Sequence, residues 1–102
     1  MAIVVSSSEA DKNVTISING RFDFSLHNEF RKAYKNNCNN GWRVIINLKD
    51  TDYLDSSALG MLLLLKEHAE NNFAEVKITN INHEIREILN IASFDKLFAL
   101  DG

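Results

Sequence analysis

The sequence of 102 residues contains no proline, a single cysteine and only four glycines. Without proline, the chain has no cis-proline switch. Cys38 on its own can form neither an intrachain disulfide nor a cysteine-based zinc cluster. The four glycines are not clustered, so the sequence has no glycine-rich phosphate-binding loop and no motif for nucleotide binding.

Strong positive charge and long apolar segments are missing as well. The formal net charge of −3 and the pI near 5.5 argue against nonspecific binding of nucleic acid, which needs a basic face. Apolar runs such as Met61–Leu65 are far too short to span a bilayer, and the first residues lack the basic start of a signal peptide. We therefore predict one domain over residues 1–102 that is cytoplasmic, does not insert into membranes and binds protein partners.

Catalytic and metal-binding patterns are weak. A Ser56, histidine and Asp55 arrangement can be imagined, but the chain has no Gly-x-Ser-x-Gly elbow. His27, His68 and His83 do not have the spacing of a metal-binding pair on one helix face. We predict that the protein is not an enzyme and that it has no metal site and no cofactor.

Hydrophobic periodicity predicts an α/β fold. Strands alternate with helices along the chain, which implies right-handed crossovers and a mixed, mostly parallel sheet of four to five strands with an opening hairpin and helices packed around it. The predicted strands are residues 3–5, 14–18, 44–48 (buried on both faces), 76–78 and a short edge strand at 96–98. The predicted helices are residues 57–71, residues 82–92 and a helix capped by Ser25 whose buried face carries Leu26, Phe30, Ala33, Tyr34 and Cys38.

The most informative segment is Asp52–Gly60, where a strand-like run ends in acids and serines before a leucine-rich helix. A hydroxyl held at a helix N-terminus faces free backbone N–H groups and the positive end of the helix dipole, both of which favour an added phosphate. The segment therefore predicts a phosphorylation switch. The alternative is that Ser56 and Ser57 are only helix caps, a role that serine fills very commonly.

The residues Asp55-Ser56-Ser57-Ala58-Leu59-Gly60 resemble the motif Asp-Ser-Ser/Thr-Gly-Leu-Gly of the STAS family, specifically the bacterial anti-sigma factor antagonists, with Ala58 in place of the common glycine. Gly20–Asp23 and Val44–Leu48 resemble two further segments of the family. The resemblance implies that Ser56 accepts the phosphate and that Asp23 lies near it in the partner surface. From the residues alone, Asp23 could equally be a turn or helix-capping residue.

The resemblance also implies the partners. The unmodified protein would bind an ATP-dependent serine kinase of the anti-sigma type and release that kinase's other client, while phosphorylation of Ser56 would expel it and a PP2C-type serine phosphatase would restore it. The alternative is a STAS-like accessory subunit of a transporter, which docks without obligatory phosphorylation. We expect a monomer or weak dimer in either case.

The helix after Ser56 carries a second signal, because the apolar side chains of Met61–Leu65 point in nearly every direction at about 100° per residue. They cannot all face one sheet, so we predict that one or two of Met61, Leu64 and Leu65 are exposed and contact a partner. The alternative is a helix that its neighbour and the chain ends cover. The predicted partner-binding residues are Asp23, Asp55, Ser56, Ser57, Met61, Leu64 and Leu65.

Overall fold

The computed structural model describes residues 2–101, which form a five-stranded sheet with three α-helices and a separate pair of short strands. The first two strands form the predicted hairpin and are antiparallel, whereas all later neighbours in the sheet are parallel. This arrangement confirms the predicted α/β fold with a mixed, mostly parallel sheet. In spatial order, the strands of the sheet are β1 (Ile3–Ser8), β2 (Asn13–Ile18), β4 (Arg43–Asn47), β6 (Glu75–Thr79) and β7 (Ala99–Leu100).

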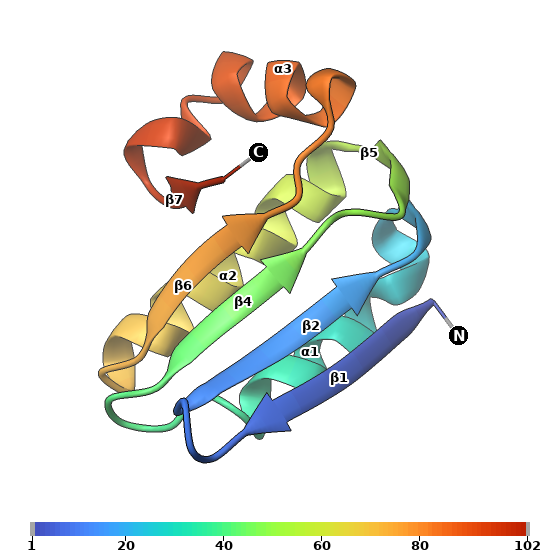
Figure 1. Cartoon of the computed structure of the whole chain (residues 1–102). Coiled ribbons are helices and arrows are strands. Elements are labelled where there is room, and N and C mark those ends of the chain that lie inside the picture. Colours follow the sequence, from blue (N-terminus) through green and yellow to red (C-terminus); the bar gives the residue numbers. More distant parts are fainter. Residues whose placement is uncertain (1, 102) are drawn as a thin grey trace.

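Two helices cover one face of this sheet, as Figure 1 shows. They are α1 (His27–Lys35) and α2 (Ser56–Asn71), which pack side by side. The third helix, α3 (His83–Ile91), lies beyond the ends to which the parallel strands point. Two short 3-10 turns complete the helical part, η1 (Phe24–Leu26) before α1 and η2 (Phe94–Lys96) before β7.

The core lies between the sheet and the two helices. Strand β2 alternates strictly, with its apolar residues Val14, Ile16 and Ile18 fully buried. The predicted apolar face of the first helical segment is confirmed, because all five of its residues are buried. Cys38 belongs to this set, and burial raises the pKa of its thiol to about 11.

The other face of the sheet is open, so the prediction that residues 44–48 form a strand buried on both faces is wrong. Val44 and Ile46 point toward the helices and are buried, but Ile45 between them points to the open face and is only half-buried. Its neighbours across the strands are Thr15 and Lys77, which can stay in contact with water. The edge strand predicted at 96–98 is displaced as well, because η2 occupies this segment and β7 follows it.

A second, two-stranded parallel sheet positions the candidate site. It consists of β3 (Gly20–Phe22) and β5 (Thr51–Leu54), with Phe22 paired to Leu54. Gly20 has a φ of +84°, a conformation that glycine adopts without strain and that turns the chain from β2 into β3. The hydroxyl of Thr51 donates a hydrogen bond to the Ile18 carbonyl (2.6 Å), which ties β5 to the main sheet.

Within residues 2–101, no helix combines the length and the apolar character needed to cross a membrane.

Candidate functional site

Helix α2 begins directly at the end of β5, and Asp55 is its N-cap residue. The Asp55 carboxylate Oδ1 accepts hydrogen bonds from the Ala58 backbone N–H (3.0 Å) and from the Ser57 hydroxyl (2.6 Å). The Ser57 hydroxyl and then the Ala58 amide hold the pKa of Asp55 below its usual value, because both favour the ionised form. Asp55 is therefore a carboxylate at neutral pH.

The two adjacent serines differ in what their hydroxyls do. Ser56 is the first residue of α2 and is exposed, and its hydroxyl makes no hydrogen bond within the described chain. Ser57 is half-buried and donates its hydroxyl proton to Asp55. Because Asp55 is the cap, the alternative in which the two serines serve only as helix caps is wrong. Ser56 offers the accessible, uncommitted hydroxyl at this helix start.

Asp23 follows β3 and caps η1. Its Oδ1 accepts hydrogen bonds from the Ser25 backbone N–H (3.0 Å) and the Ser25 hydroxyl (2.5 Å), and its Oδ2 pairs with Arg21 Nε at 3.5 Å. The hydrogen bonds from Ser25 are the main cause of the lowered pKa of Asp23. The prediction that Ser25 caps the helix is therefore wrong, because Ser25 donates to the cap and the chain enters α1 through a 3-10 turn.

The parallel pairing of β3 with β5 brings Asp23 and Asp55 next to each other, since each directly follows one member of the Phe22–Leu54 pair. The two carboxylates are close enough to interact, because the negative charge of Asp23 raises the pKa of Asp55. This effect is smaller than that of the hydrogen bonds, which lower the pKa of Asp55. The guanidinium of Arg21 lies 4.0 Å above the ring of Tyr53 and also contacts Asp23. The site is thus acidic, and the Arg21 guanidinium lies at its edge.

The apolar residues of α2 divide into a buried and an exposed set. Met61 and Leu65, which we predicted to bind a partner, have exposed fractions of only 3% and 0%, so they are core residues and this part of the prediction is corrected. Leu64 is 50% exposed, which confirms that at least one of Met61, Leu64 and Leu65 faces outward. Leu63, which we did not predict, is 42% exposed. The residues that turn α2 toward the core are Ala58, Met61, Leu62, Leu65 and Ala69.

Leu63 lies on the same stripe of α2 as Ser56. Residues four and seven positions apart share one face of a helix, so Gly60 and Leu63 follow Ser56 along the exposed surface. The sequence already places Leu63 seven residues after Ser56, which is the spacing of one helix face. This spacing predicts the exposure of Leu63 only when the buried face of α2 is known.

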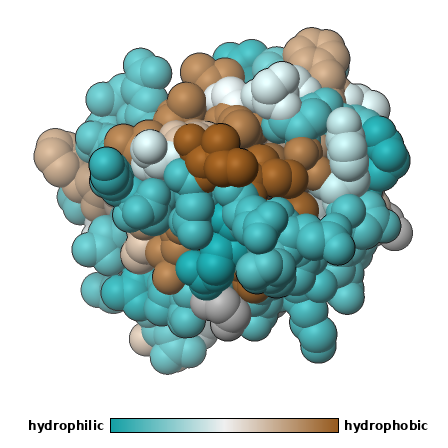
Figure 2. Space-filling view, turned by 90° about the horizontal axis from the view of Figure 1, so that it is seen from above, coloured by the Kyte–Doolittle hydropathy of each residue, from teal (hydrophilic) through white to brown (hydrophobic). Residues whose placement is uncertain are grey.

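Exposed aromatic residues surround the two acids. Phe24 is 67% exposed, and its ring stacks on the imidazole of His27 with 5.1 Å between the ring centroids. Tyr53 is also exposed, beneath Arg21. Figure 2 views the end of the molecule to which the parallel strands point and shows apolar residues gathered across its middle among hydrophilic ones. The two exposed aromatic rings, Phe24 and Tyr53, add apolar area next to the acids in the sequence.

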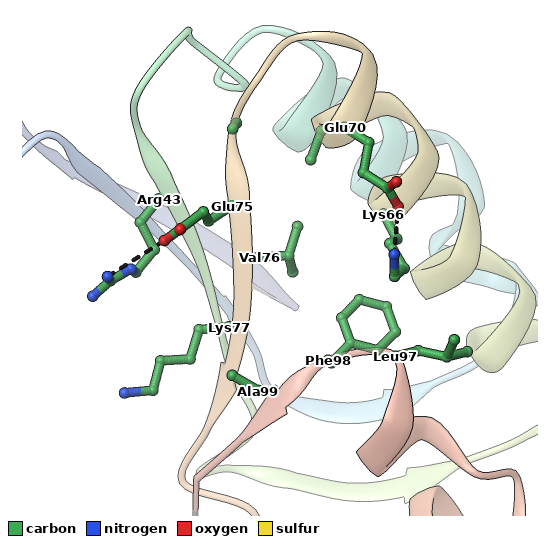
Figure 3. Close-up of a pocket in the computed structure, with 11 residues that line it drawn as sticks. Arg43, Lys66, Glu70, Glu75, Val76, Lys77, Leu97, Phe98 and Ala99 are labelled. Carbon is green, nitrogen blue, oxygen red and sulfur yellow. Dashed lines mark hydrogen bonds and ion pairs between the residues drawn. The ribbon is translucent and has the colours of Figure 1, made fainter.

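Among the hollows of the described residues, a groove and an edge hollow lie away from the serine. A groove of about 410 Å³ runs between α1 and α2 and is lined in part by Tyr34, Leu64 and His68. The other hollow, of about 500 Å³, lies at the β6 and β7 edge, where Lys66 pairs with Glu70 (Figure 3). Its charged residues are all in ion pairs, Arg43 with Glu75, Lys66 with Glu70 and Lys77 with Asp101 outside the hollow, so it offers no concentrated charge for a ligand. Within residues 2–101, no three His, Cys, Asp or Glu residues are grouped as a metal site.

The fold and the site together define a small α/β domain with a serine exposed at the start of a helix. The chain belongs to the STAS domain family, which matches it over residues 5–101. It is 44% identical over 100 residues to a STAS-domain containing protein of Pseudomonas aeruginosa (strain UCBPP-PA14), a match that covers 98% of this chain and 99% of the relative.

Solved structures share the fold at low sequence identity. An anti-sigma-factor antagonist (STAS) domain protein from Planctomyces limnophilus superposes with a TM-score of 0.80 at 13% identity, covering 98% of this chain and 89% of that chain. The phosphorylated form of the Bacillus cell fate determinant SpoIIAA superposes with a TM-score of 0.68 at 16% identity, covering 99% and 91%. A STAS domain of a SulP transporter from Vibrio cholerae has a TM-score of 0.74 at 18% identity, covering 95% and 77%.

Proposed function

We propose that this protein is a phosphorylation-controlled regulator of the anti-sigma factor antagonist kind, acting in the cytoplasm, with Ser56 as its phosphoryl acceptor. The observation that carries the proposal is the contrast between the exposed, unbonded hydroxyl of Ser56 and the hydroxyl of Ser57, which is committed to Asp55. The existence of a phosphorylated form of the similarly folded SpoIIAA supports it.

In the unmodified state, the protein binds a serine kinase of the anti-sigma type and so frees that kinase's other client. The docking surface consists of the two acids, the serine pair and the exposed side of α2. Leu63 and Leu64 supply apolar contact area, while Asp23 and Asp55 attract a partner surface with cationic or N–H donor groups. Met61 and Leu65 support this surface from the core and do not touch the partner.

Phosphorylation reverses the docking. The kinase transfers the γ-phosphoryl group of ATP to Ser56: the serine Oγ–P bond forms, the bond to the β-phosphate oxygen breaks, ADP leaves, and the serine proton passes to a base on the kinase. The product carries about −1.5 to −2 extra charges beside Asp55 and Asp23. The helix N-terminus offsets only about 0.3–1 kcal/mol of the resulting repulsion. A PP2C-type serine phosphatase hydrolyses the phosphate and restores binding.

The test is to locate the phosphate. The protein purified from its native host, and the protein incubated with host lysate and ATP, should carry one phosphate on Ser56 by mass spectrometry. Ser57→Ala is the matched control and should keep the modification, whereas Ser56→Ala should lose it. A phosphate found mainly on Ser57, Thr51 or residues 6–8 would contradict the assignment. An unmodified protein that copurifies with a transporter would instead favour the accessory-subunit alternative.

A further inference from the structure

Strand β1 forms an unusually unprotected edge of the main sheet. It is six residues long, as long as β2, and pairs with β2 in continuous register without a bulge. Its sequence Ile-Val-Val-Ser-Ser-Ser holds no charged residue and no proline, and Val4 and Val5 are 47% and 43% exposed. Edge strands usually carry a lysine, a proline, a bulge or a covering segment that prevents pairing with another chain. Strand β1 has none of the first three and lies uncovered along its length in Figure 1.

The register identifies which backbone groups on this edge are free. The Asn19 N–H donates to the Ala2 carbonyl (2.7 Å), so the pairs with hydrogen bonds fall on the even-numbered residues of β1. The N–H and C=O groups of Ile3, Val5 and Ser7 therefore point away from β2, toward the open edge. These three residues offer a row of donors and acceptors that water satisfies in the monomer and that another strand can pair.

The opposite edge of the sheet offers no comparable surface. Strand β7 has only two residues, and charged side chains flank it, including Lys66, Glu70 and Lys77 (Figure 3). A head-to-tail chain of sheets through β1 and β7 is therefore disfavoured. An association of β1 with β1 about a two-fold axis closes on itself and uses the same edge twice.

Helix α1, which packs against β1, adds matching charges. Its residues His27, Arg31 and Tyr34 line the groove toward α2, so Glu29 lies on the opposite flank, beside the β1 edge. Lys32 follows one turn later and is exposed. Neither Glu29 nor Lys32 has an ion-pair partner within the described part of the chain. Two copies related by a two-fold axis would each bring one negative and one positive group to this boundary.

We infer that β1 is a homodimerisation edge, at which two copies pair antiparallel around a two-fold axis through Val5. In this register Val5 faces Val5, Ile3 faces Ser7, and the outward backbone groups of these residues form about six hydrogen bonds. The side chains of Val4 and Ser6 become neighbours on the open face. The two sheets join into one continuous sheet, and the two Ser56 sites point in opposite directions.

The test uses Val5→Pro in the full chain. The N–H of Val5 points outward, so proline in both copies removes two of the about six bonds between the copies, one donor from each, but none of the bonds between β1 and β2. In sedimentation velocity over an about hundredfold range of concentration, the wild type should pass from monomer to dimer. Val5→Pro should raise the dimer dissociation constant at least about tenfold, whereas the control Val5→Thr, which keeps the N–H, should stay within about twofold.

Amide hydrogen exchange of the wild type checks the same register without a variant. The amides of Val5 and Ser7 should exchange at least about tenfold more slowly at high than at low protein concentration, while those of Val4 and Ser6 should not change. A monomer at every concentration, a dimer that Val5→Pro leaves intact, or concentration-independent exchange at Val5 would each overturn the inference. Association with a strand of a different protein instead of a second copy would overturn it as well.

Discussion

Phe24 stands in the same relation to Asp23 as Ser56 does to Asp55. Each acid follows one member of the paired residues Phe22 and Leu54, and each accepts a hydrogen bond from the serine hydroxyl two positions later. The residue between the acid and that serine is exposed in both cases. The two strand ends thus present an aromatic ring and a hydroxyl at equivalent positions. Under the proposed function, we expect a partner that contacts Phe24 to sense a phosphate on Ser56 as well.

The first prediction concerns the direction of the switch. Ser56→Asp should weaken binding of the cognate kinase at least tenfold, or about 1.4 kcal/mol, because it adds a negative charge beside Asp55 and Asp23. Ser56→Ala should bind as tightly as the wild type. Isothermal titration calorimetry measures both, with circular dichroism as the check on folding. Equal or tighter binding of Ser56→Asp would mean that the partner recognises the phosphorylated form.

The second prediction separates the docking side of α2 from its core side. Leu64→Gln should weaken kinase binding while changing the free energy of unfolding by no more than about 0.5 kcal/mol, as surface substitutions usually do. Leu65→Ala should destabilise the protein by about 2–5 kcal/mol, because Leu65 is fully buried. Denaturant melts and partner titrations on the same samples decide between the two. A large loss of stability in Leu64→Gln would remove Leu64 from the proposed surface.

The third prediction concerns Gly60, which lies on the exposed stripe between Ser56 and Leu63. A Cβ added there would meet no atom of the chain within 4 Å, so the fold itself does not require glycine at this position. Gly60→Ala should stabilise α2 by about 0.5–1 kcal/mol. It should also weaken kinase binding, since the added methyl group obstructs a closely packed partner.

The matched control for Gly60→Ala is Asn90→Ala, an exposed position on α3 away from the serine. It should raise stability by a few tenths of a kcal/mol, because alanine has the higher helix propensity, and leave binding unchanged. Thermal melts and titrations report both effects. If Gly60→Ala binds the kinase as well as the wild type does, the partner does not approach this turn of α2.

The fourth prediction follows from the lowered pKa of Asp55. A folded-state pKa below the unfolded value of about 3.9 means that ionised Asp55 stabilises the fold above this pH, and that the contribution is lost as the pH falls through the folded-state pKa. Asp55→Asn keeps a capping side chain that does not titrate. The advantage of the wild type over Asp55→Asn in urea denaturation should therefore be constant near neutral pH and shrink below about pH 4. An advantage that grows on acidification would contradict it.

The parts of the fold with strong periodicity could be predicted from the sequence. Apolar and polar residues alternate over the whole length of β2, which indicates a strand with one buried face. The buried residues of α1 recur at helical spacing, which indicates an amphipathic helix. The β3 and β5 pair could not be predicted, because three and four residues are too few for a period. The open face of the sheet was also missed, since a continuous apolar run such as Val44–Leu48 does not reveal whether a second layer exists.

The candidate site was predictable in its acids and serine but not in its surroundings. The motif around Ser56 fixed the position of the helix start, whereas the direction of each leucine in α2 depends on where the sheet and α1 lie. Met61, one of the predicted partner-binding residues, is therefore buried, whereas Leu63, for which no role was predicted, is exposed. Ser25 was mistaken for a cap because either Asp23 or Ser25 could begin a helix, and only the geometry of the 3-10 turn distinguishes them.

The reactivity of the Cys38 thiol reports on local unfolding near the end of α1. The thiol is buried beyond the end of α1, and its pKa of about 11 keeps it protonated at neutral pH, so a disulfide reagent in solution meets almost no thiolate while the fold is closed. Labelling can proceed only when this corner of the molecule separates from the sheet. The labelling rate of the unmodified chain therefore counts those openings, and comparing it before and after phosphorylation would show whether a charge on α2 loosens the distant end of α1.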